Sequence, residues 1–256
     1  MREIDITRGI VENHVNDFTK ALESDVVIVG AGPSGLVAGG YLAARGVNVT
    51  ILEKKLAPGG GIWGGGMGYK YVIIQEEAKS VLEDFNIPFR PWQDKLLAVD
   101  AISFASGLIF GASSMGANIF NLVDVEDLLV RDGRVTGVVI NNTFARMNHF
   151  PVDPLTLEAK AVVDATGHDH DIVHTLARKN DVRLNTPSGK PEGERSMCAE
   201  PAEDAVVHNT TEVYPGLFVC GMSTAAVYGG YRMGPVFGGM ILSGLRLKEL
   251  LLEVCK

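Results

Sequence analysis

A histidine and an aspartate stand four positions apart in the segment MNHFPVDP, residues 147–154. The imidazole of His149 can carry protons near neutral pH, and the carboxylate of Asp153 is a ligand type that metal ions accept. A proline follows each of them within two positions, a pattern that is also typical of a polar turn. By itself the segment fits either a surface turn or part of a reaction site.

A second chemical signal is the glycine motif GAGPSG at residues 30–35, with the spacing G-x-G-x-x-G. Gly30 permits a tight turn, Gly32 lets the backbone approach a pyrophosphate, and Gly35 lets a helix and a strand pack closely. Glu53 stands eighteen residues after Gly35, where a carboxylate that binds a ribose is expected. The alternative is a glycine turn between packed elements, with Glu53 on a solvated strand end.

The segments around this motif form a strand–helix–strand pattern. The β-branched run at 25–30 predicts a buried parallel strand, and VNVTILEKK at 47–55 predicts the next one. Between them, the residues after the motif predict a helix that ends at Gly46. A right-handed crossover makes the two strands parallel, which places the motif where dinucleotide-binding proteins carry it.

The rest of the chain extends this unit. The other predicted elements are an amphipathic helix over 7–22, a glycine-rich loop over 58–68, helices over 75–86 and 234–255, strands within 117–141 joined by the hairpin turn RDGR, and buried strands at 159–169 and 216–222. Together they predict an α/β fold. We expect a doubly wound parallel sheet of the glutathione-reductase or Rossmann-like type with an inserted β-meander, in one domain over residues 1–256.

Composition excludes several classes of protein. The net charge is −8 and no long basic run occurs, which argues against a general partner of nucleic acids or anionic membranes. No run of eighteen apolar residues and no apolar signal segment is present, so we expect a cytoplasmic protein without a membrane span. Cys198, Cys220 and Cys255 form neither a zinc pattern nor a disulfide framework, and reduced thiols are expected.

Five segments together carry a resemblance to a known family. GAGPSG, LEKKLAPGGGIWGGGM, VDP, ATGHD and RMGPVFGGMILSG are similar to the thiamine thiazole synthases, from about residue 7 to about residue 250. The resemblance implies a flavoprotein-like fold that binds NAD as a substrate. It implies formation of an adenylated thiazole carboxylate from NAD, glycine and a sulfur donor, with loss of nicotinamide. It also implies a ring-shaped homo-oligomer, an octamer being one option, whose active sites are shared between neighbouring chains.

The resemblance assigns roles to particular residues. Arg232 matches the arginine that holds the glycine carboxylate, which a guanidinium can grip through two parallel bonds. Asp153 and His168 match the ligands of iron(II), although each alone would also fit a polar turn or strand end. The residues that match contacts to the dinucleotide or the product are Ser34, Glu53, Lys54, Gly61, Val125 and Met222.

The chain departs from the family near Asp153. Some members have a sulfur-donating cysteine two positions before this aspartate and others a histidine, whereas this chain has Pro151. The resemblance therefore favours the branch that uses free sulfide and survives its reaction. His149 is a candidate proton carrier, with a solvent-facing side chain as the alternative.

Two other functions fit parts of the sequence. An FAD-dependent oxidoreductase of the glutathione-reductase type would explain the glycine motif but not the loop at 58–68 or the short chain. A sensor that holds NAD without chemistry would explain the absence of both cysteine and histidine at position 151.

Overall fold

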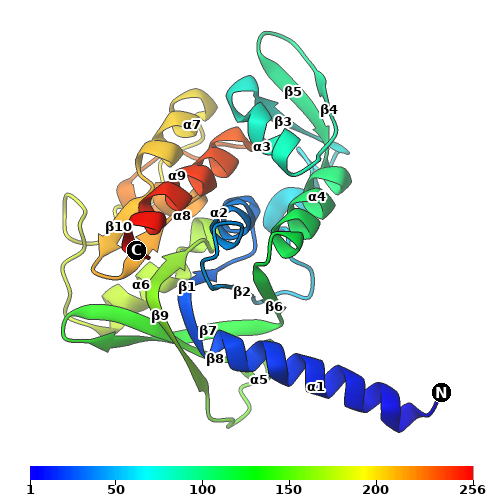
Figure 1. Ribbon diagram of the computed structural model, residues 1–256. Coiled ribbons are helices and arrows are strands. Elements are labelled where there is room, and N and C mark those ends of the chain that lie inside the picture. Colours follow the sequence, from blue (N-terminus) through cyan, green and yellow to red (C-terminus); the bar gives the residue numbers. More distant parts are fainter. Residues whose placement is uncertain (256) are drawn as a thin grey trace.

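A mostly parallel sheet forms the centre of the computed structural model, which describes residues 1–255 (Figure 1). Its strands are β1 (Glu23–Val29), β2 (Val49–Glu53), β6 (Asn118–Asn121), β7 (Val123–Arg131), β8 (Arg134–Asn142), β9 (Leu155–Asp164), β10 (Thr211–Tyr214) and β11 (Leu217–Val219). Their order is β10-β11-β9-β1-β2-β6, with the β7–β8 hairpin joined to β9. The predicted α/β class with a Rossmann-like sheet is confirmed.

Helices cover both faces of this sheet. The α-helices of the described chain are α1 (Glu3–Ala21), α2 (Pro33–Ala43), α3 (Lys79–Asp84), α4 (Ala101–Ser114), α5 (Thr143–Met147), α6 (Asp171–Lys179), α7 (Ala199–His208), α8 (Met222–Tyr228) and α9 (Gly238–Val254), and not all of them lie on the sheet. Val26 and Ile28 of β1 belong to a core with α2, α4 and α9. Val27 and Val29 alternate with them and face a second core with α6 and the β7–β8 hairpin. No helix in residues 1–255 is long and apolar enough to cross a membrane.

The strand–helix–strand unit has the predicted form. β1 and β2 run parallel, with Val26 opposite Val49, and α2 connects them. All five residues of β2 are buried, as expected of a strand inside a doubly wound sheet. The carboxyl ends of β1 and β2 therefore meet at one edge of the sheet, beside the start of α2.

The predicted meander is formed by β7, β8 and β9, which pair antiparallel in sequence. Asp132 and Gly133 make the turn between β7 and β8, with φ values of 49° and 73°. Two positive φ values are what a two-residue hairpin turn with the right twist needs, so RDGR acts as predicted. The strand predicted at 159–169 is longer at its start and ends at Asp164, because the following glycine-containing segment turns away from the sheet.

A second, three-stranded sheet lies beside α4. Its strands are β3 (Tyr71–Gln75), β4 (Phe89–Pro91) and β5 (Leu96–Asp100), in the order β3-β5-β4. The helix predicted over 75–86 is partly wrong, since it is confined to α3 and a preceding 3-10 turn (Glu76–Ala78). Alternate residues of β3 are buried where it pairs with β5, and this tertiary pairing decides its conformation.

Helix α1 is confirmed as a helix but projects from the body of the chain (Figure 1). Its last turn makes contact, through an edge-on pair of Phe18 and Phe120 with ring centroids 5.7 Å apart. Ile10 and Val15 on the predicted apolar face are 66% and 52% exposed. Ile10 and Val15 of the apolar face therefore have no cover within the described chain, whereas Phe18 of the same face does.

Close packing of α9 on α2 generates a prediction about stability. A Cβ at Gly244 would come 2.5 Å from the backbone oxygen of Ser34, whereas a Cβ at Gly9 in α1 would meet nothing within 4 Å. We expect Gly244→Ala to lower the free energy of unfolding by about 1–3 kcal/mol, because α9 must move. Gly9→Ala should not lower it, since alanine favours a helix by about 1 kcal/mol over glycine. Urea denaturation measures both, and equal stability of Gly244→Ala and the parent would contradict the packing argument.

Candidate dinucleotide and reaction site

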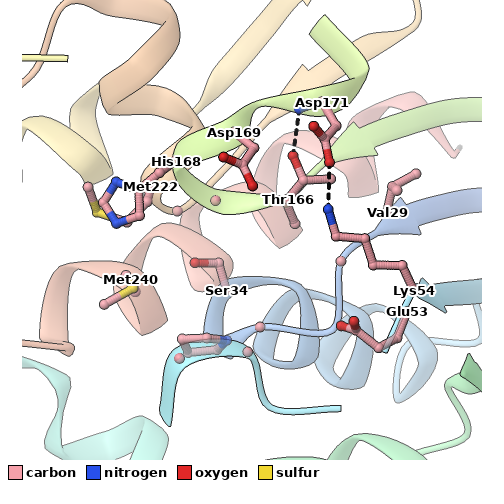
Figure 2. Close-up of a pocket in the computed structure, with 18 of the residues that line it drawn as sticks. Val29, Ser34, Glu53, Lys54, Thr166, His168, Asp169, Asp171, Met222 and Met240 are labelled. Carbon is pink, nitrogen blue, oxygen red and sulfur yellow. Dashed lines mark hydrogen bonds and ion pairs between the residues drawn. The ribbon is translucent and has the colours of Figure 1, made fainter. Parts of the chain in front are cut away.

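A cavity of about 430 Å³ opens at the carboxyl ends of the parallel strands. Val29 at the end of β1, Glu53 at the end of β2 and Ala165 after β9 all line it. This edge is where open α/β sheets bind ligands, because the loops leave a crevice there. In Figure 2, Glu53 and Lys54 lie on one side of Ser34, while His168, Met222 and Met240 lie on the other.

The glycine turn has the geometry expected for a dinucleotide. Gly30 has a φ of 108°, and a Cβ there would lie 2.3 Å from the oxygen of Ala165. A Cβ at Gly35 would lie 2.2 Å from the oxygen of Gly30, so Gly35 supports the turn from behind and is not a lining residue. A Cβ at Gly32 would meet nothing within 4 Å, so its absence leaves space in the cavity. Helix α2 begins here without a side-chain cap, and its free N–H groups favour an anion.

Glu53 is 6% exposed, which rules out the alternative of a solvated strand end. One carboxylate oxygen, Oε2, accepts the backbone N–H of Ala31 at 3.1 Å, and Oε1 accepts that of Lys55 at 2.8 Å. These bonds hold the carboxylate at the cavity wall, and each oxygen keeps a lone pair for a further donor. A pair of ribose hydroxyl groups is the type of donor that suits this position.

Lys54 lies next to Glu53 and remains a cation. Its ammonium group is 2.9 Å from Oδ2 of Asp171. Burial alone would lower the pKa of Lys54, but the hydrogen bond with Asp171 and the charges of Asp169 and Asp124 outweigh it and raise the pKa. The lysine side chain thereby extends from the end of β2 to Asp171 at the start of α6, as Figure 2 shows.

Asp164, the fully buried last residue of β9, is not among the predicted site residues. Its Oδ2 accepts the backbone N–H groups of Ile172 at 3.1 Å and Val173 at 3.0 Å, in the first turn of α6. Its Oδ1 accepts the hydroxyl groups of Thr166 at 2.7 Å and Ser223 at 3.0 Å. This carboxylate therefore joins β9, α6 and α8 and fixes the loop that carries His168. An aspartate directly after the apolar run AKAVV was the available sequence signal.

His168 lies in the short 3-10 helix η3 (Gly167–Asp169) and lines the cavity. Its Nδ1 is 2.6 Å from Oε1 of Glu194. The other oxygen of Glu194, Oε2, is 3.9 Å from Nε of Arg232. Arg232 itself does not line the cavity, but the next two residues, Met233 and Gly234, do. Glu194 is a residue that the sequence analysis missed, since no motif surrounds it.

The end of the cavity near His168 is apolar. Met222, Met233, Phe237 and Met240 line it, and the last three also escaped the residue-level sequence analysis although they lie in the motif RMGPVFGGMILSG. Methionine side chains are flexible and polarisable, so they adapt to an irregular ligand. The cavity thus has a polar end at Glu53 and Lys54 and an apolar end beside a histidine.

The structure gathers most of the predicted site residues but not all of them. Asp153 and His149 are exposed in the loop between α5 and β9 and do not line the cavity. Within residues 1–255 no three His, Cys, Asp or Glu side chains converge as a metal cluster. The predicted site residues that line the cavity are Gly30, Gly32, Ser34, Glu53, Lys54, Gly61, Val125, His168 and Met222. One chain therefore brings His168, but not Asp153, to the cavity.

Comparison with known proteins agrees with the resemblance found in the sequence. Residues 7–237 match the Thi4 family. The chain is 46% identical to thiamine thiazole synthase of Methanothermobacter thermautotrophicus over 254 residues, covering 99% of this chain and 98% of that one. It is 50% identical to that of Thermococcus kodakarensis over 244 residues, covering 95% of each. The crystal structure of Thermovibrio ammonificans THI4 superposes with a TM-score of 0.97 at 41% identity, covering 99% and 98% of the two chains.

These similarities extend over nearly the whole chain, including the cavity and the loops around it. They favour the resemblance to thiamine thiazole synthases over the flavin-dependent oxidoreductase alternative, which explained the glycine motif alone.

The role of Asp164 is testable through its charge. In Asp164→Asn, an amide N–H₂ replaces one oxygen and faces N–H or O–H donors on either side. We expect the free energy of unfolding to fall by about 2–4 kcal/mol, because a buried donor or acceptor is left without a partner. Asp181→Asn, at an exposed position, should change it by less than about 0.5 kcal/mol. Urea titrations of the three proteins measure this, and a parent-like Asp164→Asn would show that the carboxylate is dispensable.

Proposed function

Because the chain belongs to the Thi4 family and is an enzyme of thiamin biosynthesis, we propose that it forms the adenylated thiazole carboxylate from NAD, glycine and sulfide. In this reaction nicotinamide is released and the ribose carbons next to it enter the thiazole. The observation that carries the proposal is that one cavity has the glycine turn at one end and His168 at the other.

NAD binding is supported by the shape and polarity of the cavity. The pyrophosphate lies on the N-terminus of α2, where Gly32 leaves room and free N–H groups are available. The adenosine ribose donates to Glu53, which is already held by two backbone N–H groups. With NAD bound in this orientation, its nicotinamide end would lie beside Met222 and His168. The reacting ribose would then lie among apolar side chains that exclude water.

Glycine binding is assigned to Arg232. A guanidinium can hold a carboxylate through two parallel hydrogen bonds, which fixes both position and orientation. The Nε edge of Arg232 faces Glu194, so its terminal N–H₂ groups remain for the substrate.

Iron(II) fits His168 but needs a second protein ligand. A carboxylate can only accept a hydrogen bond, so the Nδ1 of His168 carries the proton and Nε2 is left with a lone pair for a metal. Bound iron(II) would supply a Lewis acid with open positions for a glycine-derived chelate. Asp153 is the other proposed ligand, and it lies outside the cavity of its own chain.

A neighbouring copy of the chain is the proposed source of that aspartate. Asp153 is surrounded in sequence by large exposed apolar side chains, which a monomer in water does not normally gather in one segment. These side chains are Phe144, Met147, Phe150, Val152 and Leu155, each more than half exposed. A homo-oligomeric ring in which this segment packs on the next chain would cover them and bring Asp153 to the neighbour's His168. The uncovered face of α1 is a further surface for such assembly.

Free sulfide is the proposed sulfur source. No cysteine lies near Asp153 in the sequence, and Cys220 is fully buried, which raises the pKa of its thiol and leaves it unreactive. Cys198 is exposed, and its backbone N–H donates to the oxygen of Arg232 at 3.0 Å. It is therefore the thiol that a test of the sulfur source must include.

The proposed function predicts multiple turnover. Purified protein under anaerobic conditions with NAD, glycine, excess sulfide and iron(II) should make more than one thiazole product per chain, and its mass should not change. Cys198→Ser should do the same, because the sulfur comes from solution. Product is counted by liquid chromatography, and the chain is weighed by mass spectrometry. One product per chain, with a mass loss matching conversion of cysteine into dehydroalanine, would refute the use of free sulfide.

The proposed sharing of the site predicts complementation between inactive variants. Asp153→Ala and His168→Ala should each abolish product formation while NAD affinity stays within about twofold of the parent. Mixed oligomers, made by co-expression with two different tags, should recover up to about a quarter of the activity, because some sites combine an intact Asp153 with an intact His168. Co-expression of Asp153→Ala with itself is the control, and no recovery in the mixture would place both ligands in one chain.

A further inference from the structure

Glu194 lies between the two residues to which the proposed function gives different substrates. Its Oε1 is 2.6 Å from Nδ1 of His168, and its Oε2 is 3.9 Å from Nε of Arg232. The Glu194 side chain is 18% exposed, against 46% for His168 and 58% for Arg232. It is the more buried partner in both contacts, as expected of a group that holds the other two in place.

The backbone around Glu194 is fixed to the end of α8. Glu192 N–H donates to the oxygen of Val227 at 3.0 Å, and Gly193 N–H to that of Ala226 at 2.9 Å. On the other side, Arg195 N–H donates to the oxygen of Gly230 at 2.8 Å. Three hydrogen bonds within four residues hold this segment against the end of α8. We call residues 192–195 the strap. The main chain at Glu194 is therefore fixed relative to the end of α8.

The loop of His168 is fixed to the same helix from the other side. The backbone N–H of Gly167 donates to the hydroxyl oxygen of Ser223 at 3.0 Å, and Ser223 lies in the first turn of α8. Both members of the His168–Glu194 contact thus rest on α8.

The chemistry of the contact follows from its atoms. A carboxylate accepts and never donates, so it selects the tautomer of His168 with the proton on Nδ1 and the lone pair on Nε2. A carboxylate behind a histidine also orients its ring and raises its strength as a metal ligand. The second oxygen lies 3.9 Å from Nε of Arg232 and attracts its charge, and a contact at Nε leaves the end of the guanidinium, formed by its two terminal N–H₂ groups, for another carboxylate.

We propose that Glu194 is a positioning residue that sets the tautomer of His168 and the orientation of Arg232 with one carboxylate. It couples the metal-binding side of the site to the side that holds the glycine carboxylate. This inference rests on the proposed function for the identity of the two ligands. The contacts that carry it are those of the protein alone.

Metal affinity and glycine kinetics test the proposal separately from product formation. Cobalt(II) is the probe for the metal, titrated anaerobically into the NAD-saturated oligomer. In Glu194→Ala we expect cobalt(II) affinity to fall about 10–100-fold, the range typical of a lost partner behind a histidine ligand. The KM for glycine should rise about tenfold while NAD affinity stays within about twofold. Glu194→Gln should lie between Glu194→Ala and the parent, because an amide has only one accepting atom and cannot serve both partners.

Two comparisons separate positioning from damage or direct ligation. Glu192→Ala alters the same strap, but Glu192 accepts from Ser188 and touches neither partner, so it should match the parent. Adding Glu194→Ala to His168→Ala should not weaken cobalt(II) binding further, because Glu194 acts on the metal only through His168. Parent-like affinity and glycine KM in Glu194→Ala would overturn the proposal. So would a further loss in the double variant, which would make Glu194 a ligand itself, or a parent that binds no cobalt(II).

Failure of the proposed function gives a different result. If the parent makes no thiazole from NAD, glycine and sulfide, but cobalt(II) binding falls in Glu194→Ala and is unaffected by it in the His168→Ala background, the function is wrong and the positioning role stands. If the parent makes thiazole and Glu194→Ala equals it in both measurements, the function stands and the positioning role is wrong.

Discussion

The site depends on the hydrogen bonds that the buried carboxylate of Asp164 accepts. It ends β9 in the middle of the sheet and accepts hydrogen bonds from the start of α6, from Thr166 and from Ser223 of α8. A buried charge is stable only when donors surround it, so these elements must keep one mutual arrangement. The loop that carries His168 leaves the sheet directly after Asp164. Its position is therefore set by the hydrogen bonds of that residue.

Helix α8 extends this arrangement to the end of the cavity that contains His168. Its first turn holds Gly167 through Ser223, and the residues at its end hold the strap that carries Glu194. Residues far apart in sequence, 168, 194 and 232, are thereby brought to one place, although no regular sheet or helix contains all three. The polar end of the cavity is simpler, because the turn at Gly30 and the carboxylate of Glu53 belong to one strand–helix–strand unit.

Two segments of the described chain, the loop that carries Asp153 and helix α1, expose apolar side chains to solvent. One physical explanation accounts for both. Asp153 lies away from the cavity, and its segment exposes Phe150 and Val152 to solvent. Helix α1 likewise presents Ile10 and Val15 outward. Exposed apolar area is unfavourable in water and is removed when copies associate. The proposed assembly would cover these surfaces and bring Asp153, the second ligand that we propose, to a neighbouring cavity.

The sequence by itself determined the sheet class, the dinucleotide unit, the RDGR hairpin and the residues at the polar end of the cavity. These features depend on contiguous segments, where apolar periodicity and the φ values open to glycine act locally. The same local signals misassigned Gln75, because its pairing with Leu96 of β5 outweighed helical spacing. Only the tertiary structure decided that the buried carboxylate of Asp164 accepts hydrogen bonds from several elements. It also decided that Glu194 faces His168 and Arg232, and that Asp153 lies away from them. Those contacts join segments that are distant in the sequence and are brought together by the topology of the sheet. The spacing of residues along the sequence does not indicate which distant segments will be in contact.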